Sequence, residues 1–315
     1  MTGPSDWAAT PYRGRPRFEG ANISTFIGFK QFMNLAEDAV LEHFRVNGAG
    51  PQKLFADHGI GMEIVDTSVR LTATLHADDE VTGQVTALPA KPGQPLGFSV
   101  KMSAVRPEGP VAVLNGKLRV ALIDEKEAGG TEPLAGDLRP AVYPDVAAAA
   151  GEGPAPVPAP DGPAAALAGP GTNGFLWSWT VPYFFCHYYT RLQSSGYVKL
   201  LEEVVDRYLD HAGLPITGLL AQRDWIPVVS RARVQLHTDA FMGETLHTTF
   251  TVDDVIKDTV FTATVHFHVL RDGQLVRTAT ATIMHGYVLA RGPVAFADLV
   301  VLDDATQRML LEGPQ

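Results

Sequence analysis

Apolar side chains recur at helical spacing in two segments of the chain. They lie at Phe32, Leu35, Ala36, Ala39, Val40 and Phe44 in the first segment, and at Tyr197, Leu200, Leu201, Val204, Val205, Tyr208 and Leu209 in the second. Spacings of three and four residues place these side chains on one face of a helix. Gly48 and Pro51 end the first pattern, and Gly213 and Pro215 end the second. The pattern predicts a long helix in each half, with a wide apolar face that suits a helix wrapped by a sheet.

Segments that alternate with period two follow each predicted helix, at 69–75 and 232–236. In the stretch 261–269, apolar residues alternate with threonine and histidine, which predicts a strand with one buried face. Asp272 and Gly273 then predict a tight hairpin turn, so that 274–287 forms the returning strand. One helix followed by long antiparallel strands predicts an α+β unit in which the helix packs on a curved sheet.

The two halves repeat one another at a separation of about 165 residues. The segment 29–40 returns at 194–205, and 98–102 returns at 261–265. Shared order and spacing predict two tandem copies of one domain, with the functional site between the copies. We expect the chain to divide into a polar tail, a first domain, a semi-extended linker rich in proline, alanine and glycine, and a second domain, at 1–17, 18–126, 127–172 and 173–315.

Composition narrows the class of protein. The chain has 315 residues, enough for two domains, and a formal net charge of -10 with no basic cluster, so we expect no nucleic-acid partner. A single cysteine, Cys186, excludes an intrachain disulfide. The N-terminus lacks a secretory pattern and no apolar run reaches about 18 residues, so we expect no membrane span and a cytoplasmic location. The alanine-, proline- and glycine-rich composition suggests a bacterial origin.

Motifs for other enzyme classes are absent from the sequence. It contains no G-x-G-x-x-G, no G-x-x-x-x-G-K and no G-x-S-x-G. Nucleotide-dependent enzymes and serine hydrolases are therefore excluded, and we expect no cofactor.

Four segments of the second half resemble the hotdog-fold acyl thioesterases. In that family a strand reading V-x-Y-x-D-x-D leads to G-H-V-N-N-x-x-Y, which opens the central helix. Residues 181–184 read Val-Pro-Tyr-Phe, and 191–203 read Arg-Leu-Gln-Ser-Ser-Gly-Tyr-Val-Lys-Leu-Leu-Glu-Glu. The segments 241–246 and 271–276 are similar to later parts of the family pattern. The resemblance implies an α+β fold of two tandem hotdog domains, a double hotdog in which one chain imitates the usual homodimer.

The resemblance also implies where catalytic residues should lie. The family's catalytic Asp falls on His187, its Gly-His pair on Thr190 and Arg191, and its two Asn on Gln193 and Ser194. The equivalent positions of the first copy hold Asn22, Phe26, Gly28 and Phe29. Neither copy keeps a carboxylate at the expected position, so the chemistry must differ if the chain is an enzyme.

Three residues are the catalytic candidates. His187 suits acid/base chemistry because histidine titrates near neutral pH. Arg191 suits binding of a carrier phosphate or a developing oxyanion, and Gln193 suits orienting water. Two of them also have a structural interpretation: a polar strand residue at the domain interface for His187, and a surface ion pair for Arg191. Further substrate-binding candidates are Tyr183, Phe185, Tyr189, Ser194, Ser195, Gly196 and His58.

Several of these candidates have competing interpretations. Ser194 and Ser195 are good helix N-cap residues. The aromatic run at 183–189 is either core or the lining of an acyl tunnel. Cys186 and His187 are neighbours on an extended strand and point to opposite faces, so we do not expect a nucleophile–base pair. His266 and His268 share a strand face, but we interpret it as a polar outer face and expect no metal site.

The resemblance implies an enzyme that hydrolyses an acyl thioester carried by coenzyme A or an acyl carrier protein, with a role in polyketide or fatty-acid-type biosynthesis as an extension. One alternative is a dehydratase, isomerase or cyclase on the same scaffold. A second is a non-catalytic acyl-binding protein. The chain would form a pseudo-dimer by itself, and pairing into a homodimer remains open.

Overall fold

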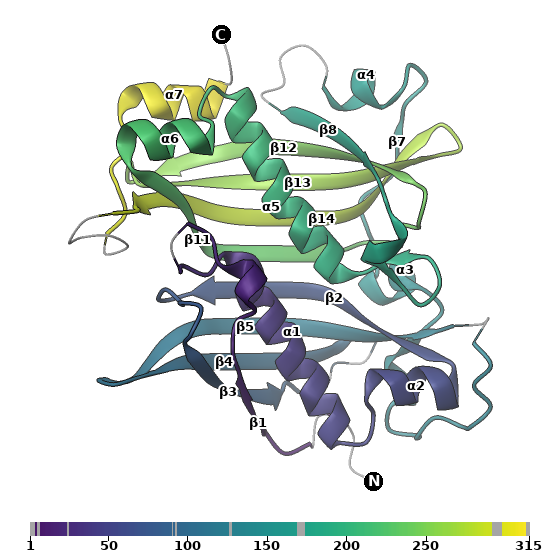
Figure 1. Cartoon of the computed structure of the whole chain (residues 1–315). Coiled ribbons are helices and arrows are strands. Elements are labelled where there is room, and N and C mark those ends of the chain that lie inside the picture. Colours follow the sequence, from purple (N-terminus) through teal and green to yellow (C-terminus); the bar gives the residue numbers. More distant parts are fainter. Residues whose placement is uncertain are drawn as a thin grey trace.

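Two long helices lie on the same side of one large sheet in the computed structural model (Figure 1). The structure describes residues 4, 7–23, 25–89, 91, 93–125, 128–168, 174–291 and 298–312. The helices are α1 (Phe29–Val46) and α5 (Ser194–His211), and they contact each other in front of the sheet. Both helices confirm the helical spacing of the sequence, and their apolar faces are buried against the strands.

Ten strands form the main path of the sheet. The first half contributes β1 (Thr10–Gly14), β2 (Ile60–Leu71), β3 (Glu80–Ala87), β4 (Leu96–Arg106) and β5 (Gly109–Asp124). The second half contributes β8 (Phe175–Thr180), β11 (Trp225–Leu236), β12 (Thr245–Ile256), β13 (Val260–Arg271) and β14 (Gln274–Leu289). Their order is β1-β3-β4-β5-β2-β11-β14-β13-β12-β8. Outward from the central pair β2 and β11, equivalent strands of the two halves follow in the same order.

The two halves join at the centre of this sheet. Strands β2 and β11 pair antiparallel over Asp66–Arg70 and Arg231–Gln235. Across the seam, Arg233 forms a bidentate ion pair with Asp66, with Nη2 and Oδ2 2.7 Å apart. The sheet is therefore continuous between the copies, as it would be in a dimer of single domains.

The repeat is regular at a spacing of 165 residues, the distance from the first residue of α1 to that of α5. The short helices α2 (Pro51–His58) and α6 (Ile216–Arg223) follow the same spacing, and each ends at a left-handed residue, Gly59 or Asp224. The bulges that interrupt β2 after Ile64 and β11 after Val229 are also 165 residues apart. Each residue of these repeated elements thus has an equivalent 165 positions away, and this register is used below.

The predicted tail and linker contain ordered elements. Within the tail, β1 pairs with β3, and Thr10 Oγ1 lies 2.7 Å from His43 Nδ1 of α1. The linker contains η3 (Arg139–Ala141), β6 (Val142–Tyr143), α3 (Val146–Ala150), β7 (Val157–Pro158) and α4 (Pro163–Leu167). Because β6 pairs with β5 and β7 with β14, this segment is fixed to both halves. The domain boundaries themselves stay a prediction.

The remaining elements are short: η2 (Phe18–Gly20), η4 (Tyr183–Phe185), β9 (Cys186–His187), β10 (Arg191–Leu192) and α7 (Asp304–Glu312). Elements η2 and η4 precede the two long helices at equivalent positions. None of the helices in the described part of the chain has the length and apolar character that a membrane crossing requires.

Candidate active site

The N-terminus of α5 is assembled from both copies of the domain. Strands β9 and β10 pair through His187 and Arg191 and lead directly into α5. The N-cap is Gln193, which makes no side-chain capping bond within the described residues, so the expectation that Ser194 or Ser195 caps the helix is wrong. The first backbone N–H groups of a helix lack intrahelical partners and carry partial positive charge. This end of α5 can therefore stabilise negative charge on a bound group.

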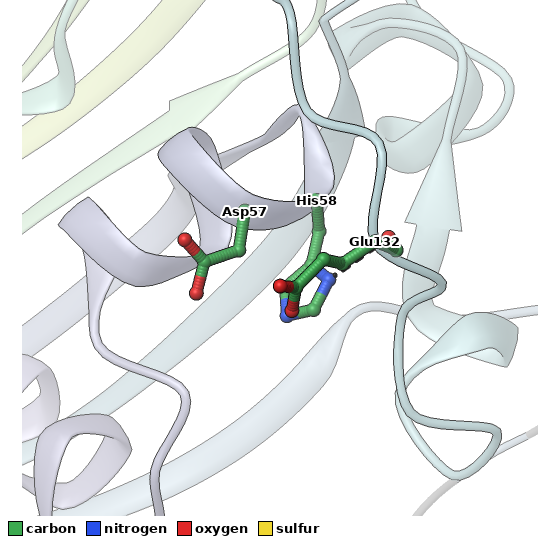
Figure 2. Close-up of side chains that lie close together, drawn as sticks. All are labelled: Asp57, His58 and Glu132. Atoms are coloured by element: carbon green, nitrogen blue, oxygen red, sulfur yellow. Dashed lines mark hydrogen bonds between the residues drawn. The ribbon is translucent and has the colours of Figure 1, made fainter.

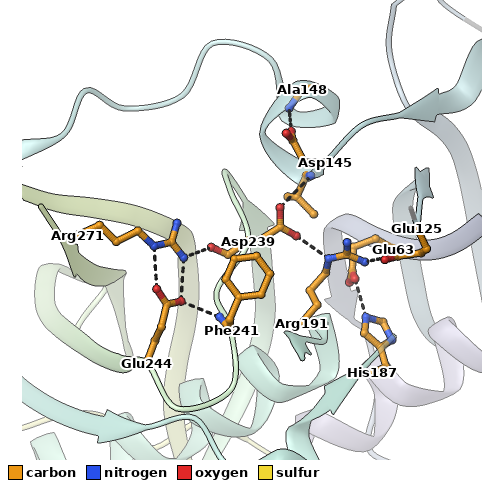
Figure 3. Close-up of polar contacts among 11 residues, drawn as sticks. Glu63, Glu125, Asp145, Ala148, His187, Arg191, Asp239, Phe241, Glu244 and Arg271 are labelled. Atoms are coloured by element: carbon orange, nitrogen blue, oxygen red, sulfur yellow. Dashed lines mark hydrogen bonds and ion pairs between the residues drawn. The ribbon is translucent and has the colours of Figure 1, made fainter. Parts of the chain in front are cut away.

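His187 pairs with a buried carboxylate from the other copy. Its Nε2 lies 2.6 Å from Oε2 of Glu63, which projects from β2 (Figure 3). The Glu63 side chain is 1% exposed, and its Oε1 has no hydrogen-bond partner among the described residues. A charge-assisted bond of this length holds the imidazole in one orientation. The resemblance implied a carboxylate at position 187, and the histidine found there contacts a carboxylate that comes from β2.

A second carboxyl group, Glu37 of α1, has a pKa close to neutrality. Burial, followed by the negative charges of Asp38 and Glu63, raises the pKa of Glu37 to about 7, although His187 and Lys199 act to lower it. A carboxyl group with a pKa near the working pH is suited to accept and return a proton.

Glu37 faces a small polar cavity of about 230 Å³ between the two long helices. This polar cavity is also lined by Gln193 and Ser195 at the start of α5, by Lys199 one turn later, and by Arg15 and Arg17 before η2. A proton acceptor and a helix N-terminus therefore border one space. We call the group formed by Glu37, Glu63, His187, Arg191, Gln193, Ser195 and Lys199 the α5 site.

Arg191 is buried in an ion network that ties the copies together. Its Nε donates to Asp239 Oδ1 at 2.6 Å, and its Nη1 donates to Glu125 Oε1 at 2.5 Å (Figure 3). Asp239 Oδ2 also accepts a bond from the backbone N–H of Val146 in α3, at 3.2 Å. The interpretation of Arg191 as a surface ion pair is therefore wrong. Two of its N–H groups donate to protein carboxylates, so Arg191 connects the two copies directly and, through Asp239, connects them to the linker helix α3.

The turn between β9 and β10 has an unusual backbone. Tyr188 and Tyr189 have φ values of 42° and 71°, which are sparsely populated by aromatic residues. Both rings pack on Phe55 of α2, with centroids 5.2 and 6.0 Å apart. Such conformations persist only where surrounding contacts enforce them. This turn fixes His187 and Arg191 on either side of it.

The remaining candidates from the second copy have different surroundings. Phe185 lies under Lys199, whose Nζ is 4.7 Å from the ring centroid. Tyr183 is 75% exposed, so its ring faces solvent. A side chain at Gly196 would place its Cβ 2.6 Å from Leu192 Cδ1, so glycine allows close packing there. Cys186 donates to the carbonyl of Pro182 and makes no pair with His187.

His58 lies at the end of α2 with Asp57 and Glu132 (Figure 2). Its Nδ1 is 3.1 Å from the carbonyl oxygen of Glu132, and one ligand atom from each of the three residues lies within 4.8 Å of the others. The three side chains form a group that can hold a metal ion. His58 thus contacts this group at the end of α2.

A much larger cavity, of about 1110 Å³, lies at the N-terminus of α1. Its walls come from the start of α1, from β11 and β14, and from the outer face of α5, and they include Phe29, Phe32, Val228, Val229 and Ile283. We call it the apolar cavity. Lys199 lines both the apolar cavity and the polar cavity, so the two adjoin at this side chain.

The carboxylates of the α5 site were missed because their partners are remote in sequence. Glu63 is separated from His187 by 124 residues. The available signal was local: Glu63 stands in the apolar run Ile-Gly-Met-Glu-Ile-Val of β2, where a charged side chain requires a buried partner. Glu37 directly follows Ala36 of the apolar face of α1 and gave no comparable signal.

Comparison with known proteins supports the fold. Residues 181–302 match the family model of the thioesterase-like superfamily. A structure from Lactobacillus plantarum, described as an oleoyl thioesterase, aligns with a TM-score of 0.59 at 13% identity, covering 95% of this chain and 100% of that one. The 12:0-ACP thioesterase from Umbellularia californica aligns with a TM-score of 0.59 at 10% identity, covering 89% of this chain and 94% of that one.

An acyl-ACP thioesterase from Bacteroides thetaiotaomicron aligns with a TM-score of 0.53 at 11% identity, covering 88% of this chain and 97% of that one. Among curated proteins, no relative matches this sequence. The predicted α+β fold of two tandem hotdog domains is confirmed, because these alignments span both copies. The chain is thus a double-hotdog protein whose second copy matches the thioesterase-like superfamily.

Proposed function

We propose that the protein hydrolyses an acyl thioester carried by coenzyme A or an acyl carrier protein, at the α5 site. The observation that carries the proposal is the shared polar cavity, in which Glu37, with a pKa of about 7, faces the N-terminal turn of α5. Structural neighbours described as acyl-ACP and oleoyl thioesterases support the same reaction class.

In the proposed reaction, the thioester carbonyl oxygen points at the backbone N–H groups at the start of α5, near Ser195. Ionised Glu37 accepts a proton from a water molecule as that water attacks the carbonyl carbon. Negative charge on the carbonyl oxygen is stabilised by the N–H groups and the helix dipole. When the C–S bond breaks, the sulfur leaves with the electron pair and takes the proton from Glu37, giving a carboxylic acid and a thiol.

His187 has a supporting role in this mechanism. Its Nε2 is bonded to Glu63, and a positive charge on the imidazole lowers the pKa of Glu37. This replaces the expectation that His187 itself transfers the proton. Arg191 likewise holds the two copies together and does not bind the carrier.

Arg15 and Arg17 suggest how the carrier is bound. Both side chains are exposed and line the polar cavity. Arginine binds phosphate groups in a fork geometry. Coenzyme A and the phosphopantetheine arm of a carrier protein both provide a phosphate at this end of the substrate.

The direct test is release of free thiol from a panel of acyl-CoA substrates, from acetyl-CoA to tetradecanoyl-CoA. We expect thiol release above the spontaneous rate for at least one substrate, with one carboxylic acid formed for each thiol. If the acyl group is altered without thiol release, the protein is instead a dehydratase, isomerase or cyclase. Binding without any reaction would instead support an acyl-binding protein.

The pH profile tests the role of Glu37. Because Glu37 must be ionised to accept a proton, kcat/KM should rise with pH and level off above a midpoint near 7. Asp38→Asn removes a negative charge that raises the pKa of Glu37, so the midpoint should shift to lower pH. His187→Asn, which installs the residue found at the equivalent Asn22, removes a charge that lowers this pKa, so the midpoint should shift to higher pH.

Opposite shifts of this kind would not arise from general loss of structure. Thermal melting of both variants across the same pH range provides the folding control. A profile whose midpoint is the same in all three proteins would contradict the assignment of Glu37 as the proton acceptor.

A further inference from the structure

The apolar cavity occupies the position in the first copy that the α5 site occupies in the second. With the register of 165 residues, four residues of its lining replace three charged residues of the α5 site and Asp239, the ion-pair partner of Arg191. Asn22, Phe26, Thr74 and Val228 line the cavity, and their equivalents are His187, Arg191, Asp239 and Glu63. A histidine, an arginine and two carboxylates have thus been exchanged for two uncharged polar and two apolar residues.

The equivalents of Glu37 and Ser195 also line the apolar cavity, but they neutralise one another. Glu202 is the equivalent of Glu37, and Lys30 is the equivalent of Ser195. Their side chains form an ion pair with Nζ and Oε2 2.7 Å apart. The Glu202 carboxylate is thus held in an ion pair within the lining of the cavity. The apolar cavity therefore keeps the position of the duplicated site, but its one equivalent of Glu37 is bound to a lysine.

From this geometry we infer that the apolar cavity binds the acyl group of a substrate whose thioester lies at the α5 site. We infer also that this acyl group is long or bulky. The inference rests on the proposed function. Of the two equivalent sites in the chain, the α5 site would then carry out the reaction and the apolar cavity would bind the acyl group. The cavity volume of about 1110 Å³ slightly exceeds the roughly 300–1,000 Å³ typical of small-molecule pockets.

The two cavities are placed for one substrate to occupy both. Lys199 lines the polar cavity beside Glu37 and also lines the apolar cavity, where its ammonium group lies over Phe185. Trp177 and Trp179 continue the apolar cavity from Phe185 along the edge strand β8. An acyl group that begins at the N-terminus of α5 can pass Lys199 and bury its apolar part among these rings.

A buried histidine in the cavity wall is a second indication of a ligand. His285 of β14 lines the apolar cavity, is 2% exposed, and has no hydrogen-bond partner for Nδ1 among the described residues. Burial lowers its pKa to about 3, so the ring is neutral. A buried polar atom without a partner costs about 1–3 kcal/mol. A hydroxyl or carbonyl group on a bound ligand would provide the partner.

The test fills the cavity at two positions of its lining, on neighbouring segments. Val228→Phe acts from β11, and Ala73→Trp acts from the segment that follows β2. Leu270→Trp is the control, because it adds a bulky ring on the exposed β13–β14 hairpin, outside the cavity. Binding is measured by the fluorescence of the neutral apolar dye N-phenyl-1-naphthylamine, which is then displaced by tetradecanoyl-CoA.

We expect wild type and Leu270→Trp to bind the dye equally, and each cavity-filling variant to bind it at least tenfold more weakly. The same variants should lose at least tenfold more kcat/KM on tetradecanoyl-CoA than on acetyl-CoA. Equal dye binding by all four proteins, or dye that tetradecanoyl-CoA does not displace, would overturn the inference. If tetradecanoyl-CoA displaces the dye but no thiol is released, the apolar cavity binds acyl groups and the proposed hydrolysis is refuted. If thiol is released and the cavity-filling variants lose the same activity on both substrates, hydrolysis is supported and the role of the apolar cavity is refuted.

Discussion

Glu37→Gln is expected to lower kcat on the best acyl-CoA substrate by about 10²–10⁴-fold, the range attributed to general acid–base catalysis. Glutamine has the shape of protonated glutamate but cannot accept a proton. Because the change leaves the cavity lining in place, KM should change little. The same substitution at the equivalent Glu202 should cost less than tenfold, since Lys30 already neutralises that carboxylate.

The same variant should be more stable than wild type at alkaline pH. The pKa of Glu37 is raised from 4.5 to about 7 in the folded protein, so the unfolded chain releases this proton first, and stability falls as the pH rises from about 4.5 to 7. Removing the ionisable group should raise the free energy of unfolding at pH 8.5 by roughly 1–3 kcal/mol, because one pKa unit corresponds to about 1.4 kcal/mol. Below about pH 4, where Glu37 is protonated in both the folded and the unfolded state, the two proteins should have similar stability.

Glu42→Gln is the matched control, because Glu42 lies on the same helix in an exposed pair with Arg45. It should change neither kcat nor the pH dependence of stability. An active Glu37→Gln protein would remove Glu37 from the mechanism. Lost activity together with lower stability at pH 8.5 would indicate a structural role for this carboxyl group.

The sequence predicted the repeating architecture because that information is local. Apolar spacing in 32–44 and 197–209 located α1 and α5, and the Asp272-Gly273 turn located the β13–β14 hairpin. The separation of the two helices by 165 residues followed from the same patterns. The pairing of 98–102 with 261–265 was wrong by two residues, because the strands keep the 165-residue register and 98–102 corresponds to 263–267. Strand β1 was missed because Thr10–Gly14 is a short edge strand with little apolar content, and its stability comes from pairing with β3.

The candidate site was only partly predictable because its chemistry depends on contacts between copies. The residues before α5 were identified, and His187 and Arg191 do lie together there. Their partners Glu63 and Glu125 are 124 and 66 residues away in the first copy, on β2 and directly after the end of β5. No local sequence pattern indicates a contact between residues that are so far apart in the chain. The pKa of Glu37 depends on burial between two helices, which a helical pattern does not reveal.

Arg191→Phe is expected to destabilise the protein by about 3–5 kcal/mol, the cost of breaking a buried ion pair by removing one partner. The substitution leaves Glu125 and Asp239, which are 9% and 8% exposed, without their shared cation. Arg233→Met provides the comparison, because Arg233 also joins the copies, through Asp66, but is 45% exposed. A pair of that kind contributes about 0–1 kcal/mol. Urea denaturation with a constant m-value measures both losses.

The chain itself provides the design for a rescue. At the equivalent positions of the other copy, Phe26, Ala290 and Thr74 replace Arg191, Glu125 and Asp239, and Phe26 and Ala290 are buried. The triple variant Arg191→Phe, Glu125→Ala, Asp239→Thr should therefore recover stability to within about 1–2 kcal/mol of wild type, since apolar packing often replaces a buried ion network at little cost. The bond from Val146 to Asp239 is lost, so recovery should be incomplete. If Arg191→Phe costs no more than Arg233→Met, the network is solvated and does not hold the copies together. If the single variant is unstable and the triple variant is equally so, Arg191 stabilises the fold by packing and not by neutralising the two carboxylates.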